Sequence, residues 1–509
     1  MKTLLTQLEQ QARTSPASIA IRSGDESLTY DQLMSAVQQT ADQLKGNRVK
    51  SLGLYLDNGI EWIVVDLAAM AACIRIVPLP WFFSDEQISH AIQNGAVDSL
   101  VFATEVPSGI VGAGSPIRLY KGSQQQSIKP RTSQSAVTAS IGGKVSYTSG
   151  STGKPKGIEL DYAFIDQTCR SISVAISGLG TETHLSILPY ATLLENIAGV
   201  YVPLMLGKTV YAESSASVGL SADLRLDPAK LQQTVNQIRP NSLIITPQLL
   251  ELFCMLVESN AVDPECLVFV AVGGARVGEA LMHRARGAGI PAYEGYGLTE
   301  FGSVAILNTP QQDRVGSVGK PLPGVVVKLA EDGEICLGTT LIQGKDDSSR
   351  PKTVTVKTGD LGSIDDDGFI YVHGRKSNLI VLSTGRNVAP EWIETELNAS
   401  AMILQSYVFT ETKSELSALL VAAESGIADS DLDLEKNRIN AALPPYAQVK
   451  NWYRLSEPFS RANQMLTANG RLRRLQIKKV LPALLARAQS SIPITSGDLS
   501  NYSLREMNQ

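Results

Sequence analysis

The segment 147–157 combines three glycines, two lysines and several hydroxyl side chains, a combination suited to holding a polyphosphate. Glycines let the backbone bring its N–H groups close to an anion, while hydroxyl and ammonium groups supply further donors. The segment therefore predicts a site for a nucleoside triphosphate. The candidate residues of this phosphate loop are Thr148, Ser149, Gly150, Ser151, Thr152, Gly153, Lys154 and Lys156.

The phosphate loop has two alternative interpretations. A Walker A motif needs a glycine five residues before its Gly-Lys-Ser/Thr; here Thr148 has that place and Pro155 follows Lys154, so the motif is absent. A flexible linker has a similar composition. Residues 145–148 and 158–160, however, predict short strands on either side, which favours a tight connection inside a folded core.

The elements that must position this loop alternate between helix and strand up to about residue 295. Such alternation predicts an α/β fold in which helices cover both faces of parallel sheets. Helices are predicted over residues 30–44 and 59–73, and strands over 51–56, 99–103, 242–246 and 267–272.

The rest of the chain has a different pattern. The polar stretch 122–140 predicts a surface connection, and the short β runs with Asp/Gly turns after Pro321 predict a small β-rich subdomain. From about Gly374 the pattern predicts a compact α+β tail. A length of 509 residues exceeds one hydrophobic core and suggests about three compact units.

Composition limits the partners. The net charge of −5 gives no electrostatic reason to expect nucleic acid. The N-terminus lacks the apolar run of an export signal. Asp66 and Arg75 interrupt the apolar stretch 62–83. This stretch therefore predicts a buried helix followed by a strand, and no integral membrane segment is expected. We therefore expect a cytoplasmic protein. Its five cysteines and four histidines lack metal-ligand spacing, so we also expect reduced cysteines and no zinc site.

A second set of candidate residues lies in the octapeptide 293–300. Tyr296, beside Gly297, is suited to lie flat on a purine, while Thr299 can hydrogen-bond a phosphate. The carboxylate of Glu300 is suited to a phosphate-bridging Mg²⁺ ion. A glycine turn with a buried tyrosine remains the alternative.

Weaker signals occur further along the chain. Asp360 follows a glycine turn and is placed to accept ribose hydroxyls, and Arg375 lies beside a flexible glycine. Ordinary turn chemistry and a charged surface turn are the respective alternatives. A flat slot for a base is predicted where large side chains are missing, at Gly273, Gly274 and Ala275.

Taken in this order, the segments resemble the adenylate-forming superfamily, which includes acyl-CoA synthetases, firefly luciferase and the adenylation domains of peptide synthetases. The similarity runs from residues 28–33 to the tail and is nearest to the fatty acyl-CoA synthetases. It implies that a carboxylate attacks the α-phosphate of ATP to give an acyl-adenylate, and that a thiol then takes the acyl group. It also implies a large N-terminal domain, residues 1–374, and a mobile C-terminal domain, residues 375–509.

The resemblance also implies roles for single residues. The phosphate loop, with Thr152 and Lys156 acting in catalysis, would bind the β- and γ-phosphates. Residues 273–275 and the turn at Tyr296 and Gly297 would together bind adenine. Thr299 would contact the α-phosphate, Glu300 the Mg²⁺ ion, and Asp360 and Arg375 the ribose.

Two positions bear on the chemistry near the C-terminus. Arg471 stands where the family has a catalytic lysine that bridges the substrate carboxylate and the α-phosphate, and this exchange is not conservative. Gly385 matches the family glycine beside the pantetheine arm, which favours a second step that forms a thioester, with coenzyme A as the leading acceptor. Two alternatives stay open: a fatty acyl-AMP ligase that delivers to an acyl carrier protein, and a homologue that binds nucleotide or acyl-adenylate with impaired adenylation.

The acyl group is suggested by the segment 188–196. Thr192 replaces the histidine of the fatty acyl relatives, and no aspartate is found that would hold a substrate ammonium. The sequence therefore favours a substrate acid without an amino group, namely a medium- or long-chain fatty acid.

Overall fold

The computed structural model describes residues 3–103, 117–119, 124–127, 142–148, 155–221, 226–341, 352–467 and 471–490. Two compact units make up the chain. The first comprises Met1–Gly274, His283–Lys328 and Cys336–Val356, and the second comprises Ala275–Met282, Leu329–Ile335 and Lys357–Gln509.

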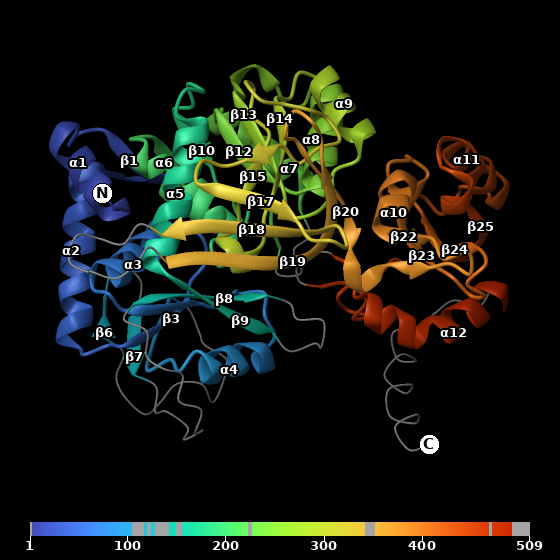
Figure 1. Cartoon of the computed structure of the whole chain (residues 1–509). Helices are drawn as coiled ribbons and strands as arrows, with labels where there is room; N and C mark the ends of the chain where they lie inside the picture. The colour runs from blue at the N-terminus through green and yellow to red at the C-terminus, as the bar shows by residue number, and fades with distance from the viewer. Residues whose placement is uncertain are drawn as a thin grey trace. The chain divides into compact units, whose positions relative to one another are not determined.

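A seven-stranded sheet in the first unit carries the flanks of the phosphate loop (Figure 1). Its strand order is β6-β7-β5-β3-β4-β8-β9, and the four strands from β5 to β8 are parallel. The outer strands β6, β7 and β9 each run antiparallel to a neighbour. The strands are β3 (Ser51–Tyr55), β4 (Arg75–Pro78), β5 (Ser99–Phe102), β6 (Ile117–Arg118), β7 (Gln124–Ser127), β8 (Gly143–Thr148) and β9 (Lys156–Asp161).

A nine-stranded sheet forms the other half of this unit, in the order β16-β15-β14-β13-β12-β10-β11-β1-β2. The strands from β14 to β1 are parallel, and the remaining edge strands are antiparallel. They are β1 (Ile19–Ser23), β2 (Glu26–Thr29), β10 (Thr183–Leu185), β11 (Thr209–Tyr211), β12 (Ser242–Ile245), β13 (Phe269–Val272), β14 (Ala292–Tyr296), β15 (Ile306–Leu307) and β16 (Lys320–Pro321).

Helices accompany both sheets. α3 is buried on all sides, since every residue from Trp62 to Met70 is buried. The helices are α1 (Leu4–Thr14), α2 (Tyr30–Gly46), α3 (Ile60–Ala71), α4 (Asp85–Asn94), α5 (Tyr162–Ile176), α6 (Val202–Met205), α7 (Pro228–Ile238), α8 (Pro247–Glu258) and α9 (Glu279–Gly287), with the π-helix η1 (Glu195–Tyr201) and the 3₁₀ turns η2 (Pro264–Cys266) and η3 (Thr299–Phe301).

A four-stranded sheet follows in the order β17-β18-β19-β20, visible as the long yellow and orange arrows of Figure 1. It confirms the β-rich subdomain expected after Pro321. Its strands are β17 (Val325–Leu329), β18 (Glu334–Leu341), β19 (Lys352–Ile364) and β20 (Ile370–Arg375).

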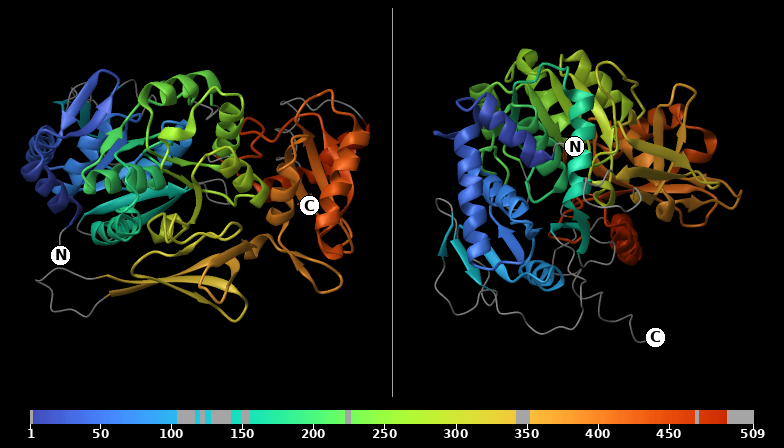
Figure 2. Two further views of the ribbon diagram at one scale, coloured as in Figure 1. Left: turned by 90° about the horizontal axis from the view of Figure 1, so that it is seen from above. Right: turned by 60° about the vertical axis from the view of Figure 1, so that its left-hand side comes forward.

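The α+β tail is built on a three-stranded sheet, shown in orange and red in Figure 2. Side chains alternate between its faces: Val408 joins the core formed with α10 and α11, whereas Tyr407 and Phe409 join the core formed with α12. The elements are β21 (Ile380–Val381), β22 (Asn387–Val388), β23 (Ile403–Phe409), β24 (Leu416–Ala422), β25 (Val449–Leu455), α10 (Pro390–Asn398), α11 (Asp429–Ala442), α12 (Arg474–Ser490), η4 (Lys376–Asn378) and η5 (Pro445–Ala447).

The predicted fold class is confirmed, with one local correction. Within the stretch predicted as a surface connection, Gln124–Ser127 forms β7, which pairs antiparallel with β5. This strand is polar and is recruited by backbone pairing, so it leaves no hydrophobic alternation in the sequence. The domain boundary at residues 374 and 375 and the mobility of the C-terminal domain remain predictions. In the part of the chain that the structure describes, no helix is both long and apolar enough to cross a bilayer.

Candidate active site

The two ends of the phosphate loop lie side by side. β8 ends at Thr148 and β9 begins at Lys156, and these two residues are partners in the antiparallel ladder. The predicted flanking strands are thus confirmed, and the loop joins two paired strands of a sheet. Lys156 is exposed. The candidates Ser149, Gly150, Ser151, Thr152, Gly153 and Lys154 lie outside the described residues.

Helix α4 holds both ends of this loop. The Tyr147 hydroxyl donates to the carbonyl of Ala91 at 3.0 Å and lies 2.9 Å from Asn94 Oδ1. On the other side, His90 Nε2 lies 3.0 Å from the carbonyl oxygen of Pro155. Burial raises the pKa of Tyr147, so its hydroxyl keeps its proton at neutral pH. His90 and Asn94 leave no signal in the sequence, because each is an isolated polar residue on an amphipathic helix.

The adenine candidates follow two neighbouring parallel strands. Gly273 and Gly274 come directly after β13, and Tyr296 ends β14 beside it. A Cβ on Gly273 would lie 3.8 Å from the carbonyl oxygen of Gly295, the residue before Tyr296. Gly274 has a φ of +88°, which favours glycine. The structure therefore brings Gly273, Gly274 and Tyr296 together at the carboxyl ends of the strands, where open α/β sheets bind ligands.

The turn after Tyr296 admits no side chain at its first position. A Cβ on Gly297 would lie 2.0 Å from the carbonyl oxygen of Ser303. Thr299 and Glu300 then form η3, and both are half-buried. Phe301 anchors this 3₁₀ turn, because it is 2% exposed and packs edge-on against Phe164 of α5, with ring centroids 5.5 Å apart.

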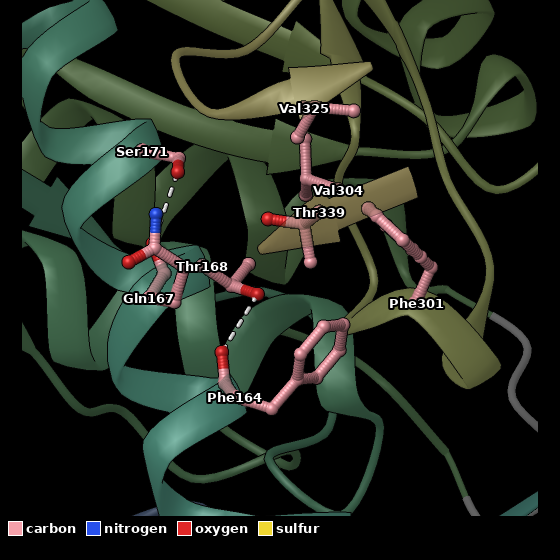
Figure 3. Close-up of a pocket in the computed structure, with 8 residues that line it drawn as sticks. All are labelled: Phe164, Gln167, Thr168, Ser171, Phe301, Val304, Val325 and Thr339. Carbon is pink, nitrogen blue, oxygen red and sulfur yellow. Dashed lines mark hydrogen bonds between the residues drawn. The ribbon is translucent and has the colours of Figure 1, made fainter. Parts of the chain in front are cut away.

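A small cavity lies behind this turn, between α5 and strands of the first unit (Figure 3). Its volume of about 10 Å³ suits a single water molecule and excludes an acyl chain. We assign it to the packing of η3 on α5. The lining residues are Phe164, Gln167, Thr168, Ser171, Phe301, Val304, Val325 and Thr339.

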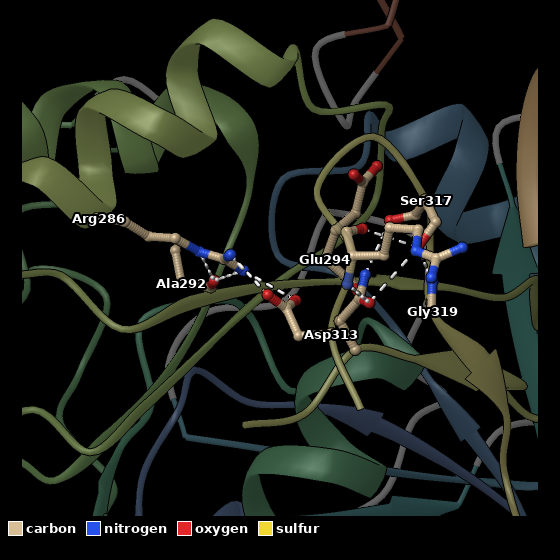
Figure 4. A network of polar contacts seen from close by, with 8 residues as sticks. Arg286, Ala292, Glu294, Asp313, Ser317 and Gly319 are labelled. Atoms are coloured by element: carbon tan, nitrogen blue, oxygen red, sulfur yellow. Dashed lines mark hydrogen bonds and ion pairs between the residues drawn. The ribbon is translucent and has the colours of Figure 1, made fainter. Parts of the chain in front are cut away.

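A polar network fixes the strand that carries Tyr296 (Figure 4). The Arg286 guanidinium donates to the carbonyl of Ala292 at 2.9 Å and to Asp313 at 2.6 Å. Asn308 donates to the carbonyl of Ser317 at 2.8 Å, and its backbone N–H donates to the carbonyl of Glu294 at 2.9 Å. These bonds tie the start and the middle of β14 to the segment that follows it.

The two ribose candidates form an ion pair in the second unit. Asp360 and Arg375 are partners in the β19–β20 ladder, and Arg375 Nε lies 2.7 Å from Asp360 Oδ1. Asp360 is 6% exposed. Its backbone N–H donates to Thr358 Oγ1, and Thr358 donates in turn to the carbonyl of Ile335 at 2.8 Å. The pair is therefore a preformed feature at the end of β20.

Gly385 and Arg471 occupy two separate turns of this unit. Gly385 has a φ of +77° between β21 and β22, and no described atom lies within 4 Å of a Cβ built there. Arg471 is exposed at the end of a short hairpin, where its carbonyl accepts from the Thr467 N–H at 2.7 Å and its N–H donates to Thr467 Oγ1 at 3.1 Å. An antiparallel bridge between Leu466 and Leu472 closes this Arg471 hairpin.

The segment predicted to face the acyl group runs into the core. Thr192 donates to the carbonyl of Pro189 at 2.6 Å, whereas Glu195 and Asn196 are fully buried in η1. Glu195 Oε1 lies 3.0 Å from His184 Nε2. These two buried side chains therefore anchor the segment.

A buried ion pair lies next to both the phosphate loop and the segment 188–196. It was not predicted from the sequence. Lys144 Nζ in β8 lies 2.8 Å from Asp66 Oδ1 in α3, and both side chains are 1% exposed. Lys144 also donates to the Tyr201 hydroxyl at 2.9 Å and closely to Asn196. Burial lowers the pKa of the Lys144 ammonium, and Asp66 opposes that shift. The one signal in the sequence was Asp66 inside an apolar run.

Comparison with solved structures defines the class of fold. The o-succinylbenzoate CoA synthetase (MenE) of Bacillus subtilis, solved with the acyl-adenylate intermediate OSB-AMP, matches with a TM-score of 0.72 at 22% identity, over 93% of this chain and 97% of that chain. The anthranilate CoA ligase AuaEII, solved with anthranoyl-AMP, matches with a TM-score of 0.76 at 17% identity, over 96% and 98% of the two chains.

The sequence comparisons go further than the fold. The chain belongs to the AMP-binding enzyme family, whose model matches residues 8–340. A long-chain-fatty-acid–CoA ligase of Mycobacterium bovis, FadD15, is 26% identical over 439 residues, 71% of each chain. A 2-succinylbenzoate–CoA ligase of Bacillus cereus is 28% identical over 431 residues, 80% of this chain and 85% of the relative. Both the resemblance to the adenylate-forming superfamily and the prediction of an enzyme like the acyl-CoA synthetases are confirmed.

Proposed function

We propose that this enzyme activates a carboxylic acid with ATP and transfers the acyl group to coenzyme A. In the first step a carboxylate oxygen bonds to the α-phosphorus of ATP, and pyrophosphate leaves. In the second step the thiol sulfur of coenzyme A bonds to the acyl carbon, AMP leaves and the thiol proton is released. The relatives named above are CoA ligases, which supports coenzyme A over an acyl carrier protein as the acceptor.

One structural observation carries this proposal. The glycines after β13 and Tyr296 at the end of β14 lie on neighbouring strand ends, and the turn after Tyr296 then presents Thr299 and Glu300. Attack on phosphorus builds negative charge on the phosphate oxygens, so positioned cations and N–H donors, rather than a covalent nucleophile, give the stabilisation. We assign the phosphate loop, Thr299 and Arg471 to that stabilisation, and Asp360 and Arg375 to the ribose.

The donor set fits a Mg²⁺ ion that is delivered with the nucleotide. Within the described ranges, no group of three or more His, Cys, Asp and Glu side chains is arranged to hold a metal. Mg²⁺ needs no such cluster, because it commonly keeps several waters and binds one or two carboxylates together with substrate phosphates. Glu300 would supply the carboxylate, and the bound ion would neutralise phosphate charge.

The acid is proposed to be a medium- or long-chain fatty acid. The lack of an aspartate for a substrate ammonium and the similarity to FadD15 support this choice. The similarity to a 2-succinylbenzoate–CoA ligase favours a second candidate, an aromatic acid of that type. Apolar walls discriminate by only about 1–3 kcal/mol per methylene, so the substrate has to be found by assay.

A substrate panel tests the proposal. The purified protein is incubated with ATP and Mg²⁺ and with octanoate, palmitate, 2-succinylbenzoate or anthranilate, in the presence and absence of coenzyme A, and pyrophosphate, AMP and thioester are measured. We expect pyrophosphate and thioester with a fatty acid. Absence of pyrophosphate with every acid would favour the homologue that binds without turnover. AMP release that ignores coenzyme A would favour a carrier protein as the acceptor.

Arg471 should tolerate replacement by lysine. The hairpin fixes the backbone of residue 471 through Thr467, so an ammonium would extend from the same position. We expect the Arg471→Lys variant to retain or raise the rate of pyrophosphate release, with any loss below about tenfold, or ~1.4 kcal/mol. Arg473→Lys, two residues away, is the matched control. Loss of pyrophosphate release in the Arg471→Lys variant alone would show that the arginine has a specialised role.

A further inference from the structure

Strand β19 is distorted directly before Asp360, one of the two ribose candidates. Gly359 has a φ of +71°, in the left-handed region that favours glycine and that ordinary strand residues avoid. The β19–β20 ladder runs from its hairpin to the partners Asp360 and Arg375 and stops there, so Gly359 lies just outside it. The direction of the Asp360 carboxylate therefore depends on what holds Gly359 in this conformation.

A buried glutamate of the neighbouring strand holds Gly359. Glu334, the first residue of β18, is 7% exposed, and its Oε1 atom accepts the Gly359 N–H at 2.9 Å. A hydrogen bond to a carboxylate is stronger than one to a neutral carbonyl. The carbonyl of the next residue, Ile335, accepts from the Thr358 hydroxyl at 2.8 Å. The start of β18 therefore binds both residues that precede Asp360.

The Arg375 guanidinium depends on the same stretch of chain. Its Nη1 atom donates to the carbonyl of Thr358 at 3.3 Å, while its Nε atom lies 2.7 Å from Asp360 Oδ1. These two acceptors flank Gly359. A rotation of the backbone at Gly359 would move both acceptors and displace the guanidinium with them. The conformation of one glycine thus sets both members of the ribose pair.

The second oxygen of Glu334 has a separate partner. Lys376 Nζ lies 3.3 Å from Glu334 Oε2 and closely contacts Asp332 Oδ2. The side chains of Lys376 and Asp332 are 48% and 49% exposed, so water can replace either of them. Glu334 therefore keeps its bond to Gly359 without Lys376, and this bond needs no residue after Arg375.

We propose that Glu334 is a positioning residue for ribose recognition: its carboxylate fixes the left-handed conformation of Gly359 and thereby directs Asp360 and Arg375 at the ribose hydroxyls of ATP. This proposal rests on the proposed function, because that function assigns Asp360 and Arg375 to the ribose. The bond between Glu334 and Gly359 would persist in any position of the C-terminal domain.

The experiment measures nucleotide selectivity at equilibrium, in the full-length protein and without an acid, so that no ATP is consumed. The Kd values of ATP, 2′-deoxy-ATP and 3′-deoxy-ATP are measured by isothermal titration calorimetry with Mg²⁺ in excess. The selectivity is the ratio of each deoxy-nucleotide Kd to the Kd of ATP. A general weakening of the site cancels in this ratio, whereas a displaced Asp360 does not.

The variants separate the contacts of Glu334. Glu334→Met fills a similar volume without an acceptor, whereas Glu334→Gln keeps an acceptor oxygen. Asp360→Ala is the reference for a lost ribose contact, alone and combined with Glu334→Met. Lys376→Met removes only the second partner of Glu334. Glu331→Ala, which removes an exposed carboxylate three residues from Glu334, is the matched control.

We expect the wild type to bind ATP about tenfold more tightly than either deoxy-nucleotide, or better, since a hydrogen bond to a charged group has this effect. Glu334→Met and Asp360→Ala should each bring the ratio below about threefold, because a slightly misplaced group loses most of its effect. The double variant should match Asp360→Ala, because both changes remove the same contact. Glu334→Gln, Lys376→Met and Glu331→Ala should keep the wild-type ratio.

Three outcomes would overturn this inference while the ribose assignment stands. If Asp360→Ala loses the selectivity and Glu334→Met keeps it, Glu334 positions nothing. If Glu334→Met weakens the binding of all three nucleotides equally, Glu334 serves only the fold. If Lys376→Met loses the selectivity as well, Glu334 acts through Lys376 and not through Gly359.

Failure of the proposed function gives different results. If the wild type binds ATP no better than its deoxy analogues, the assignment of Asp360 and Arg375 to the ribose fails first, and this inference fails with it. If the wild type and its variants show the expected selectivities but no acid yields pyrophosphate, the ligase reaction is overturned and the role of Glu334 in ribose recognition is supported.

Discussion

Replacing Glu300 with alanine is expected to lower turnover by about 10²- to 10³-fold or more, the usual effect of removing one electrostatic contact to a transition state. Glu300 supplies the single protein carboxylate that we assign to Mg²⁺. The turn that carries it should survive the change, because Phe301 packs on Phe164 and Gly302, with a φ of +72°, closes η3. The loss should therefore appear in catalysis and not in folding.

The measurement compares kcat and kcat/KM for pyrophosphate release at increasing Mg²⁺ concentration. Glu331→Ala is the matched control, since Glu331 is an exposed glutamate in a turn. The thermal midpoint of the Glu300→Ala variant should match the wild type. Retention of more than about a tenth of the wild-type rate at saturating Mg²⁺, a barrier change below ~1.4 kcal/mol, would remove Glu300 from the metal site.

The secondary structure was predictable where a local signal sets it. The helix predicted over residues 30–44 is α2, and it begins with a capping box in which Thr29 and Gln32 bond to each other's backbone. The stretch 62–83 is a buried helix followed by a strand, as predicted, because apolar residues dominate it and only Asp66 and Arg75 interrupt its apolar pattern. β7 shows the limit, since a Gln-rich strand that pairs through its backbone carries no local signal.

The site was predictable as a set of segments and not as a set of contacts. Glycine-rich turns after strands indicated Gly273 and Tyr296, but their proximity depends on β13 pairing with β14, which no local pattern encodes. The same holds for side chains that act across the fold. The ion pair of Glu394 and Arg474 joins residues 80 positions apart, and that of Lys144 and Asp66 joins residues 78 apart. Such pairs follow from packing, so only the structure reveals them.

The pair of Lys144 and Asp66 has an architectural consequence for the site. Lys144 lies in the strand that ends at Thr148, where the phosphate loop begins. Its partners Asn196 and Tyr201 lie in the π-helix Glu195–Tyr201, which begins within the segment 188–196. Three elements therefore meet at one ammonium group. A buried charge is costly unless it is paired and hydrogen-bonded, so this point of the fold is sensitive to substitution.

We expect Lys144→Met to destabilise the first unit by about 3–5 kcal/mol, because a methionine fills the space but leaves the Asp66 carboxylate buried without its counter-ion. Asp66 would keep only the donors of Tyr201 and Asn196. The measurement is the midpoint of urea unfolding, followed by the near-ultraviolet circular dichroism of the first unit's aromatic residues. Lys328→Met, at an exposed strand position, is the matched control and should leave the midpoint unchanged.

The double variant Lys144→Met/Asp66→Asn distinguishes the two possible causes of this destabilisation. If the single variant suffers from an unpaired buried charge, the neutral asparagine should restore most of the lost stability, since replacing a whole buried pair is commonly tolerated. If the loss instead comes from imperfect packing of the methionine, the second substitution should add to it. A Lys144→Met protein as stable as the wild type would show that the ion pair contributes nothing to the stability of the fold.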